Sequence, residues 1–268
     1  MKQEALAISA AEGDPGRRLN LLREYAQAFA LRSLHEAGAF ENLSFVGGTA
    51  LRFLFDLARF SEDLDFSLEN PAGSDLEKWM GKLERDLRFA GFDPSLSIKK
   101  DKVVQTVWLR MGGILKEAGL AALPAQKLSI KLEIDTRPPA GAKTETRIVN
   151  RFFLMGIRHH DLPCLMAGKI RALLTRGYPK GRDWYDLLWY RTRNPPVEPN
   201  LPFLNASLEQ GTEGEGIKAS NWKAVLVAKA EAADWNALLR DVGPFLERPG
   251  DRDLLRRDYL LASIREDP

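Results

Sequence analysis

The segment from Phe45 to Phe66, FVGGTALRFLFDLARFSEDLDF, constrains the fold of this chain more than any other stretch. A short apolar strand, Leu43 to Val46, runs into a Gly-Gly-Thr turn. A helix is predicted after the turn, because apolar residues recur there at helical spacing. Asp63 to Phe66 then alternates polar and apolar side chains, which is typical of a half-buried strand. The segment therefore predicts a strand, a turn, a helix and a second strand in immediate succession.

Asp63 and Asp65 lie two residues apart on the second predicted strand and share one face, while Leu64 and Phe66 point toward the core. Two neighbouring carboxylates repel each other unless a cation lies between them. Magnesium is commonly held by one or two carboxylates together with the phosphates of a substrate. We therefore interpret Asp63 and Asp65 as ligands of a divalent metal ion.

The turn before the helix, Gly47-Gly48-Thr49, has the composition of a phosphate-binding turn. Glycine lets a polyphosphate approach the backbone closely, and the amides at the start of a helix favour anions. We assign Gly47, Gly48 and Thr49 to nucleotide binding. A Gly-Gly turn alone, or an Asp-x-Asp pair alone, is weak evidence for function. The two in this order are far more specific.

The order Gly-Gly-Thr, thirteen residues, Asp-x-Asp resembles the signature of the polymerase-beta-like nucleotidyltransferases, a Gly-Ser, a spacer and Asp-x-Asp. The sequences GGTAL and RFSEDLDF are similar, more specifically, to those of the AbiEii toxin family, the nucleotidyltransferase half of bacterial abortive-infection toxin–antitoxin pairs. Thr49 replaces the serine of the superfamily but retains a hydroxyl group. A calcium-binding loop is excluded, because Leu68 occupies the position that requires glycine. In haloacid-dehalogenase-type phosphatases the Asp-x-Asp motif directly follows an apolar strand. Here the segment from Arg59 to Glu62 precedes the motif instead, so that reading is not favoured.

The segment from Lys127 to Asp135 alternates strictly and predicts a strand with one apolar and one polar face. The resemblance implies a third metal-binding carboxylate on a strand beside the Asp-x-Asp strand, where it serves a two-metal centre. Glu133 and Asp135 are both candidates, and we also assign Lys131 to nucleotide binding. The alternative is an edge strand with a solvated polar face.

The helix predicted after Asp161 carries Lys169 within its apolar stripe. A lysine is rarely fully buried unless it is paired, so Lys169 needs an anion, and a nucleotide phosphate would serve. Alternatively, its stem packs while its ammonium group reaches water. His159 and His160 are adjacent and point in opposite directions, which argues against a histidine metal site.

The following segment, KGRDWYDL, resembles a later AbiEii motif that pairs an aspartate with the helix lysine. The resemblance implies that Lys169 contacts nucleotide and that Asp183 is its polar partner, with Asp186 as the alternative and Arg182 as a further nucleotide contact. These residues could instead only tie two helices together.

The net charge of +2 predicts no nucleic-acid partner by itself, so that argument depends on local groups. From Lys169 to Arg193 there are seven basic and two acidic residues, with five Tyr and Trp residues between them. Basic residues contact phosphates and aromatic residues stack on bases, although a packed helix with a basic solvated side would look the same. The single cysteine, Cys164, excludes an internal disulfide. We expect a cytoplasmic protein without membrane segments.

We expect an α/β (α+β) fold with a nucleotidyltransferase core and N-terminal helix over residues 1–157 and a helical domain over residues 158–268. Residues 1–16 are expected to form a loose or accessory leader, 17–37 a long helix, and 74–89 a helix capped by Ser74. Strands are expected over 95–99, 103–110 and 147–157, and a loop or short helix over 112–126. Residues 194–202 are expected to form a proline-rich linker, and 203–268 a helical C-terminal part with two breaks.

The resemblance implies a reaction in which Mg²⁺ or Mn²⁺ supports transfer of a nucleoside monophosphate from a nucleoside triphosphate (NTP) to an acceptor hydroxyl. It further implies a toxin that acts on the 3′ end of transfer RNA and is silenced by a separately encoded antitoxin. Two alternatives stay open: the acceptor could be a small molecule or a protein, or the chain could be a catalytically silent module that binds nucleotide or antitoxin.

Overall fold

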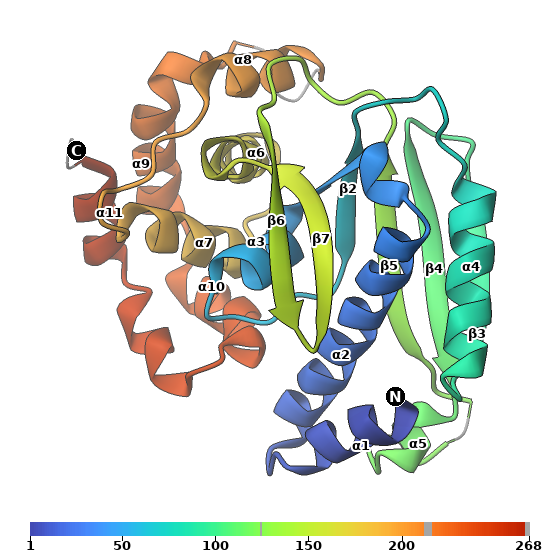
Figure 1. Cartoon of the computed structure of the whole chain (residues 1–268). Coiled ribbons are helices and arrows are strands. Elements are labelled where there is room, and N and C mark those ends of the chain that lie inside the picture. Colours follow the sequence, from blue (N-terminus) through green and yellow to red (C-terminus); the bar gives the residue numbers. More distant parts are fainter. Residues whose placement is uncertain (124, 212–215, 266–268) are drawn as a thin grey trace. The chain divides into compact units, whose positions relative to one another are not determined.

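The computed structural model describes residues 1–123, 125–211 and 216–265, and its centre is a mixed sheet of seven strands in the order β3-β4-β5-β2-β1-β7-β6 (Figure 1). This sheet and its helices confirm the expected α/β fold. The strands are β1 Leu43–Val46, β2 Leu64–Leu68, β3 Asp93–Lys99, β4 Val104–Gly112, β5 Leu128–Asp135, β6 Thr144–Arg151 and β7 Phe153–His160.

The strand order places β5 inside the sheet, between β4 and β2. β5 is antiparallel to β4 and parallel to β2, and β2 is antiparallel to β1. The alternative reading of β5 as an edge strand is therefore wrong. Its polar face lines the centre of the sheet instead of an open edge.

The apolar face of β5 lies in the core, and Leu128, Ile130, Leu132 and Ile134 are each at most 3% exposed. Helices α2 (Pro15–Glu36) and α4 (Leu76–Phe89) cover this face of the sheet (Figure 1). The hydrophobic effect thus fixes which way the strand faces, because a one-residue slip would bury its charged side chains. The polar side chains of β5 point to the opposite face.

The first sixteen residues are more ordered than the expected loose leader. Helix α1 (Lys2–Ala10) buries Ala5 and Ser9, and Tyr25 donates a hydrogen bond of 2.7 Å from its hydroxyl to Glu4. The leader prediction is wrong because small residues pack closely against α2, a contact that a search for large apolar side chains overlooks. The long helix α2 confirms the helix expected near residues 17–37.

Two other predictions need correction. Asp75 rather than Ser74 caps α4, since its side chain accepts a hydrogen bond from the amide of Lys78. The single strand expected over residues 147–157 is two adjacent strands, β6 and β7, and the chain turns at Phe152, which has φ of +64°. Positive φ values are uncommon for residues other than glycine. A phenylalanine at this position therefore did not indicate a turn in the sequence.

The other helices complete the fold. α5 is the short helix expected between residues 112 and 126, α10 ends at the expected break before Gly243-Pro244, and the break expected at Gly211–Gly216 involves residues 212–215, outside the described ranges. The helices are α3 Gly47–Phe55, α5 Ile114–Glu117, α6 Leu162–Thr175, α7 Gly181–Arg191, α8 Leu201–Glu209, α9 Trp222–Ala232, α10 Trp235–Val242 and α11 Arg257–Arg265.

The contacts divide the chain into two compact units. The sheet unit comprises residues 1–56, 60–138 and 145–159, and the helical unit comprises residues 57–59, 139–144 and 160–268. In the helical unit α7 packs against α6, α10 and α11. The sequence-based boundary between residues 157 and 158 stays a prediction about domains. Among the described residues, no helix has the length and apolar content needed to cross a membrane.

Candidate active site

The turn between β1 and α3 brings the backbone of Gly47 against the carboxylate of Asp65. Gly47 has φ of +79°, a conformation that glycine adopts without steric cost. A Cβ atom at this position would lie 2.2 Å from Oδ2 of Asp65, and the register of β1 and β2 pairs Val46 with Asp65. Only glycine therefore allows the turn and the carboxylate to approach this closely.

Thr49 ties the same turn to the other aspartate. The residue is fully buried, and its hydroxyl donates a hydrogen bond to the backbone carbonyl of Asp63. The hydroxyl is thus used within the sheet unit, and it holds the start of α3 against the residue that precedes β2. This contact gives Thr49 a positioning role for Asp63.

Asp63 and Asp65 flank Leu64, the first residue of β2, and both are half-buried. Leu64 and Phe66 are at most 1% exposed, as the alternating pattern predicts. The apolar neighbours anchor the strand in the core and leave the two carboxylates on the same, accessible face. The sheet unit thus brings both aspartates beside the Gly47 turn.

The parallel pairing of β2 and β5 distinguishes the two candidate third acids. Glu133 is the register partner of Asp65, whereas Asp135 is the partner of Ser67. Neighbouring strands are about 4.8 Å apart, and two residues along a strand add roughly 6.6 Å. Glu133 is therefore level with the aspartate pair. Asp135 lies farther along the strand, where its carboxylate accepts a hydrogen bond of 3.0 Å from the amide of Arg137.

Lys131 shares the polar face of β5 with Glu133, and its Nζ lies 2.8 Å from Oε2 of Glu133. Burial by itself lowers the pKa of Lys131, but the hydrogen bond and charge of Glu133, together with the charges of Asp63 and Asp65, outweigh it and raise the pKa. Lys131 is thus a cation within the field of all three carboxylates. Its single positive charge offsets only part of their negative charge.

The donor chemistry of Asp63, Asp65 and Glu133 fits a hard divalent cation, which prefers carboxylate oxygens. The side chains are not drawn together around one point, however. Within the described ranges, no three Asp, Glu, His or Cys side chains form a group that could hold a metal ion. The assignment of a metal site to Asp63, Asp65 and Glu133 therefore depends on the register of β2 and β5 and on the close approach of Gly47 to Asp65. The ammonium group of Lys131 lies near the same three carboxylates.

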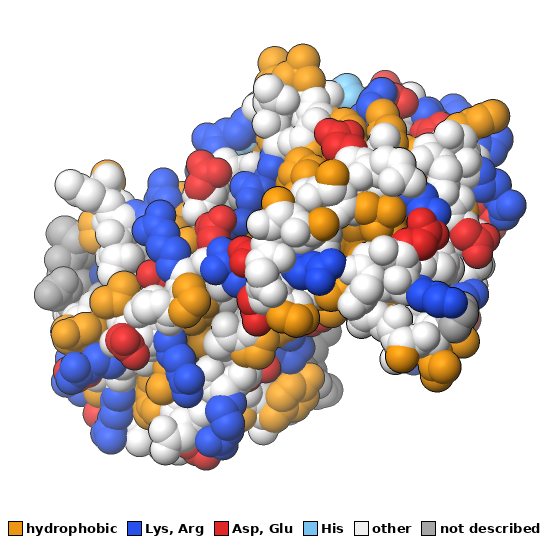
Figure 2. All heavy atoms as spheres, turned by 90° about the horizontal axis from the view of Figure 1, so that it is seen from below, with side chains coloured by type: hydrophobic (Ala, Val, Ile, Leu, Met, Phe, Trp, Pro, Cys, Tyr) orange, Lys and Arg blue, Asp and Glu red, His pale blue; other side chains and the backbone are white. Residues whose placement is uncertain are grey.

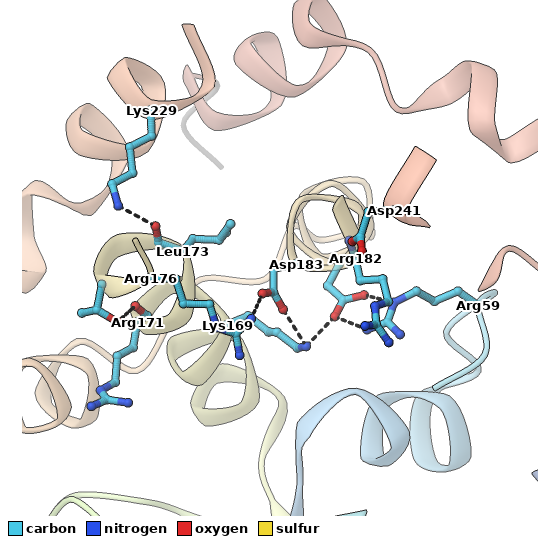
Figure 3. A network of polar contacts seen from close by, with 11 residues as sticks. Arg59, Lys169, Arg171, Leu173, Arg176, Arg182, Asp183, Lys229 and Asp241 are labelled. Carbon is cyan, nitrogen blue, oxygen red and sulfur yellow. Dashed lines mark hydrogen bonds and ion pairs between the residues drawn. The ribbon is translucent and has the colours of Figure 1, made fainter. Parts of the chain in front are cut away.

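The helical unit contains a buried network of charges around Lys169 (Figure 3). The Nζ atom of Lys169 lies 3.1 Å from Oδ1 of Asp183 and 2.8 Å from Oδ2 of Asp186. Arg59 donates to both carboxylate oxygens of Asp186 at 2.6 Å, and Arg176 donates to Asp183. Both aspartates project from α7 at a spacing of three residues, which puts them on one face. Lys169 therefore has two anionic partners within the protein.

Among the described residues, ion pairs join the cations Lys169, Arg59 and Arg176 to the carboxylates of Asp183 and Asp186. Burial alone lowers the pKa of Lys169, but the charges of Asp186 and Asp183 outweigh it, so the pKa is raised. Burial likewise raises the pKa of Asp183, but Lys169 and Arg176 outweigh it and lower the pKa. Lys169 and Asp183 are therefore both charged at neutral pH.

The two aspartates differ in their surroundings. Asp186 is completely buried between Arg59 and Lys169, whereas Asp183 connects Lys169 to Arg176, whose side chain is 38% exposed. Asp183 therefore lies on the solvent side of the network and Asp186 on its inner side. The guanidinium of Arg182 lies 4.2 Å from the ring centroid of Phe245 and so is directed at that ring.

A second buried network supports α3, the helix that begins at the Gly47 turn. Arg52 donates a hydrogen bond of 2.7 Å from Nε to Glu24, and Arg151 lies 3.0 Å from the same oxygen. Arg52 and Glu24 are both 3% exposed. These contacts join α3 to α2 and β6, and so they fix the direction in which the turn faces.

Sequence reasoning missed Arg59, Arg176, Arg52 and Glu24, although Arg59 lies in the quoted RFSEDLDF segment. One signal was present for Arg59, which stands between Leu57 and Phe60. A charged residue in apolar surroundings is rarely buried without a partner. The partner itself, Asp186, is 127 residues away in the chain, and the sequence offers no indication of that pairing.

Residues 30–257 match the family model described as "Nucleotidyl transferase AbiEii toxin, Type IV TA system". One similar solved structure, from H. pylori, is described provisionally as a nucleotidyltransferase; it has a TM-score of 0.58 and 19% identity, and the match covers 91% of this chain and 92% of that one.

JHP933 from Helicobacter pylori is similar with a TM-score of 0.56 and 18% identity, over 92% of this chain and 90% of that one. At these identities the two structures show the fold alone. No curated protein matches the chain significantly.

Proposed function

The chain belongs to the AbiEii family of nucleotidyltransferase toxins from type IV toxin–antitoxin systems, and we propose that it transfers a nucleoside monophosphate from an NTP to the 3′-terminal hydroxyl of transfer RNA. One observation carries the proposal: Asp65 lies against the Gly47 turn and is level with Glu133 on the neighbouring strand. This arrangement joins a phosphate-binding turn to a set of carboxylates, as nucleotidyl transfer requires.

In the proposed reaction, an oxygen of the acceptor hydroxyl forms a bond to the α-phosphorus of the NTP. The bond from that phosphorus to the bridging oxygen of the β-phosphate breaks, and pyrophosphate leaves. A carboxylate of the Asp63, Asp65 and Glu133 set accepts the hydroxyl proton. The backbone amides of Gly47, Gly48 and Thr49 bind the β- and γ-phosphates, since amides at a helix start favour anions.

Mg²⁺ or Mn²⁺ held by Asp63, Asp65 and Glu133 would lower the pKa of the acceptor hydroxyl and neutralise charge on the phosphates. Asp135 lies two residues farther along β5 and is the less favourable ligand. Lys169 is 14% exposed, and in this proposal its ammonium group contacts a phosphate of the nucleotide. Asp183 and Asp186 hold its ammonium group, and Arg182 is a further nucleotide contact in this proposal.

The proposed acceptor follows from local charges. On the face seen in Figure 2, Lys and Arg side chains are scattered with Asp and Glu side chains between them. The basic and aromatic run from Lys169 to Arg193 begins at the lysine of the buried network. An RNA end would find phosphate contacts there, whereas a small uncharged acceptor would need none. The type IV family also implies an antitoxin partner.

The proposal is tested by incubating the purified protein with Mg²⁺ and each labelled NTP in turn, separately with total RNA, with protein extract and with small hydroxylated metabolites. We expect label in transfer RNA, its loss after EDTA treatment, and recovery with Mg²⁺ or Mn²⁺. Label only in protein or metabolites would overturn the RNA acceptor but keep the enzyme class. No label in any arm would favour a silent binding module.

A second prediction concerns Lys131, which occupies the field of the carboxylates. Lys131→Met removes the ammonium group that competes with the metal ion, so we expect about fivefold tighter Mn²⁺ binding. This factor corresponds to ~1 kcal/mol, the interaction energy of a partly exposed charge pair. The metal-free protein should have a lower Tm, because the carboxylates lose their cation. Calorimetric titration with Mn²⁺ and thermal unfolding measure both effects.

Lys127→Met is the matched control, because Lys127 precedes the same strand and is exposed. It should change neither Mn²⁺ affinity nor Tm. Equal Mn²⁺ affinity in wild type and Lys131→Met would show that Lys131 does not compete with the metal.

A further inference from the structure

A pocket of about 240 Å³ lies in the helical unit, where α6 ends and the chain turns into α7. Its wall comes from the last turn of α6, the connecting segment 177–180, the first turn of α7 and the C-terminal end of α9. Asp183 lines the pocket and also binds Lys169. The pocket is therefore continuous with the buried network of the helical unit.

The charge of the pocket is positive. Arg176, Lys180 and Lys229 line it, with Asp183 as its only acidic residue among the described lining. Lys229 donates to the backbone carbonyls of Leu173, at 2.9 Å, and Leu174 (Figure 3), so its ammonium is held at the carbonyl end of α6. An anion in this pocket would meet more positive than negative charge.

Two aromatic residues give the pocket a second property. Tyr178, on the connecting segment, is 62% exposed, and the ammonium of Lys180 lies 5.8 Å from its ring centroid. Trp184 lines the pocket and is 2% exposed, and its indole nitrogen has no hydrogen-bond partner among the described residues. An exposed ring beside cations is the combination that stacks on a nucleic-acid base.

We propose that this pocket binds a nucleotide of the single-stranded end of the RNA acceptor, with its base stacked on Tyr178 and its phosphate beside Arg176 and Lys180. The inference rests on the proposed function, because it assumes an RNA acceptor. The free NTP is a poorer occupant, since Arg176 and Lys229 already bind internal partners. A single phosphate suits the remaining charge better than three phosphates do.

The test measures binding without catalysis. A fluorescent single-stranded RNA of about a dozen nucleotides and a non-hydrolysable NTP analogue are titrated separately, in wild type and in Tyr178→Ala, at several salt concentrations. We expect RNA binding to weaken roughly tenfold in Tyr178→Ala, as for loss of one stacked base, with NTP binding and Tm unchanged. Tyr178→Trp should bind RNA like wild type, because it restores an aromatic face.

Tyr259→Ala is the matched control, since Tyr259 is 48% exposed on α11, with the guanidinium of Arg256 4.8 Å from its ring centroid, and does not line the pocket. It should leave RNA binding unchanged. Lys180→Ala should reduce the slope of log affinity against log salt by about 0.7, the value for one lost phosphate contact on a single strand.

Three results would overturn the inference: wild type that does not bind the RNA, equal RNA binding by the Tyr178→Ala and Tyr259→Ala variants, or a loss of NTP binding instead of RNA binding in Tyr178→Ala. Failure of the proposed function would look different. Wild type and variants would then show the expected RNA affinities, but no label would pass from any NTP to RNA.

Discussion

Asp63→Asn and Asp65→Asn are each expected to reduce nucleotide transfer by about three orders of magnitude, the scale of losing one preorganised charged group at a reaction centre. Asparagine keeps the volume of aspartate but removes the charge that holds a divalent cation. Both positions are half-buried at the edge of the core, so the fold should persist. The measurement is initial-rate transfer of labelled nucleotide to RNA, with circular dichroism and Tm as tests of folding.

Two variants on β5 provide the comparison. Glu133→Gln should reduce activity strongly, because Glu133 is level with Asp65, whereas Asp135→Asn should retain most of it, because Asp135 is level with Ser67. Mn²⁺ affinity should likewise fall strongly in Glu133→Gln and change little in Asp135→Asn. Wild-type turnover in a folded Asp63→Asn or Asp65→Asn variant would remove the metal assignment, and a loss in Asp135→Asn alone would exchange the roles of the two acids.

Asp186→Asn is expected to destabilise the protein by about 3–5 kcal/mol, because it leaves a buried cation without its partner. Arg59 is 2% exposed and donates two hydrogen bonds of 2.6 Å to Asp186. Asparagine has one acceptor oxygen where aspartate has two, so it cannot accept both hydrogen bonds from Arg59 in the same geometry. Thermal unfolding should show a decrease in Tm of roughly 10 °C.

A double variant separates loss of charge from loss of packing. Replacing Arg59 and Asp186 together, in Arg59→Met with Asp186→Leu, should recover part of the stability, because buried ion pairs are often replaceable by apolar residues of similar volume. Lys169 loses Asp186 in this variant but keeps Asp183 as its partner. If Asp186→Asn unfolds like wild type, the pair with Arg59 contributes little to stability. If the double variant is less stable than Asp186→Asn, the cost comes from packing rather than from the unpaired charge.

Asp183→Asn is the matched comparison on the same helix. Its partner Arg176 is 38% exposed and can turn to water, so the loss should be smaller. Because the pKa of Asp183 is lowered in the folded state, its contribution is present above the unfolded pKa and is lost as the pH falls through the folded value. The variant should therefore lose less stability than wild type on acidification below about pH 4.

Local patterns in the amino-acid sequence were enough to predict several strands and helices and the side chains that they present. Strict alternation in β5 decided which face is apolar, because only one face can be buried without also burying charge. Asp-x-Asp placed two carboxylates on one face for the same reason. Gly-Gly-Thr was expected to be a turn before a helix, whereas these three residues are the first of α3 itself. The apolar stripe of α6 left two readings of Lys169 open, an ammonium paired with an anion or one that reaches water.

Contacts between residues far apart in the chain became visible in the folded protein alone. The order of the strands brings Glu133 rather than Asp135 level with Asp65, and strand order depends on how the whole chain packs. The pairing of Arg59 with Asp186 spans 127 residues, and Lys169 contacts both Asp183 and Asp186. Local periodicity reports which face of an element is buried, but it carries no information about what lies against that face. Those partners are selected by packing and charge compensation across the folded chain.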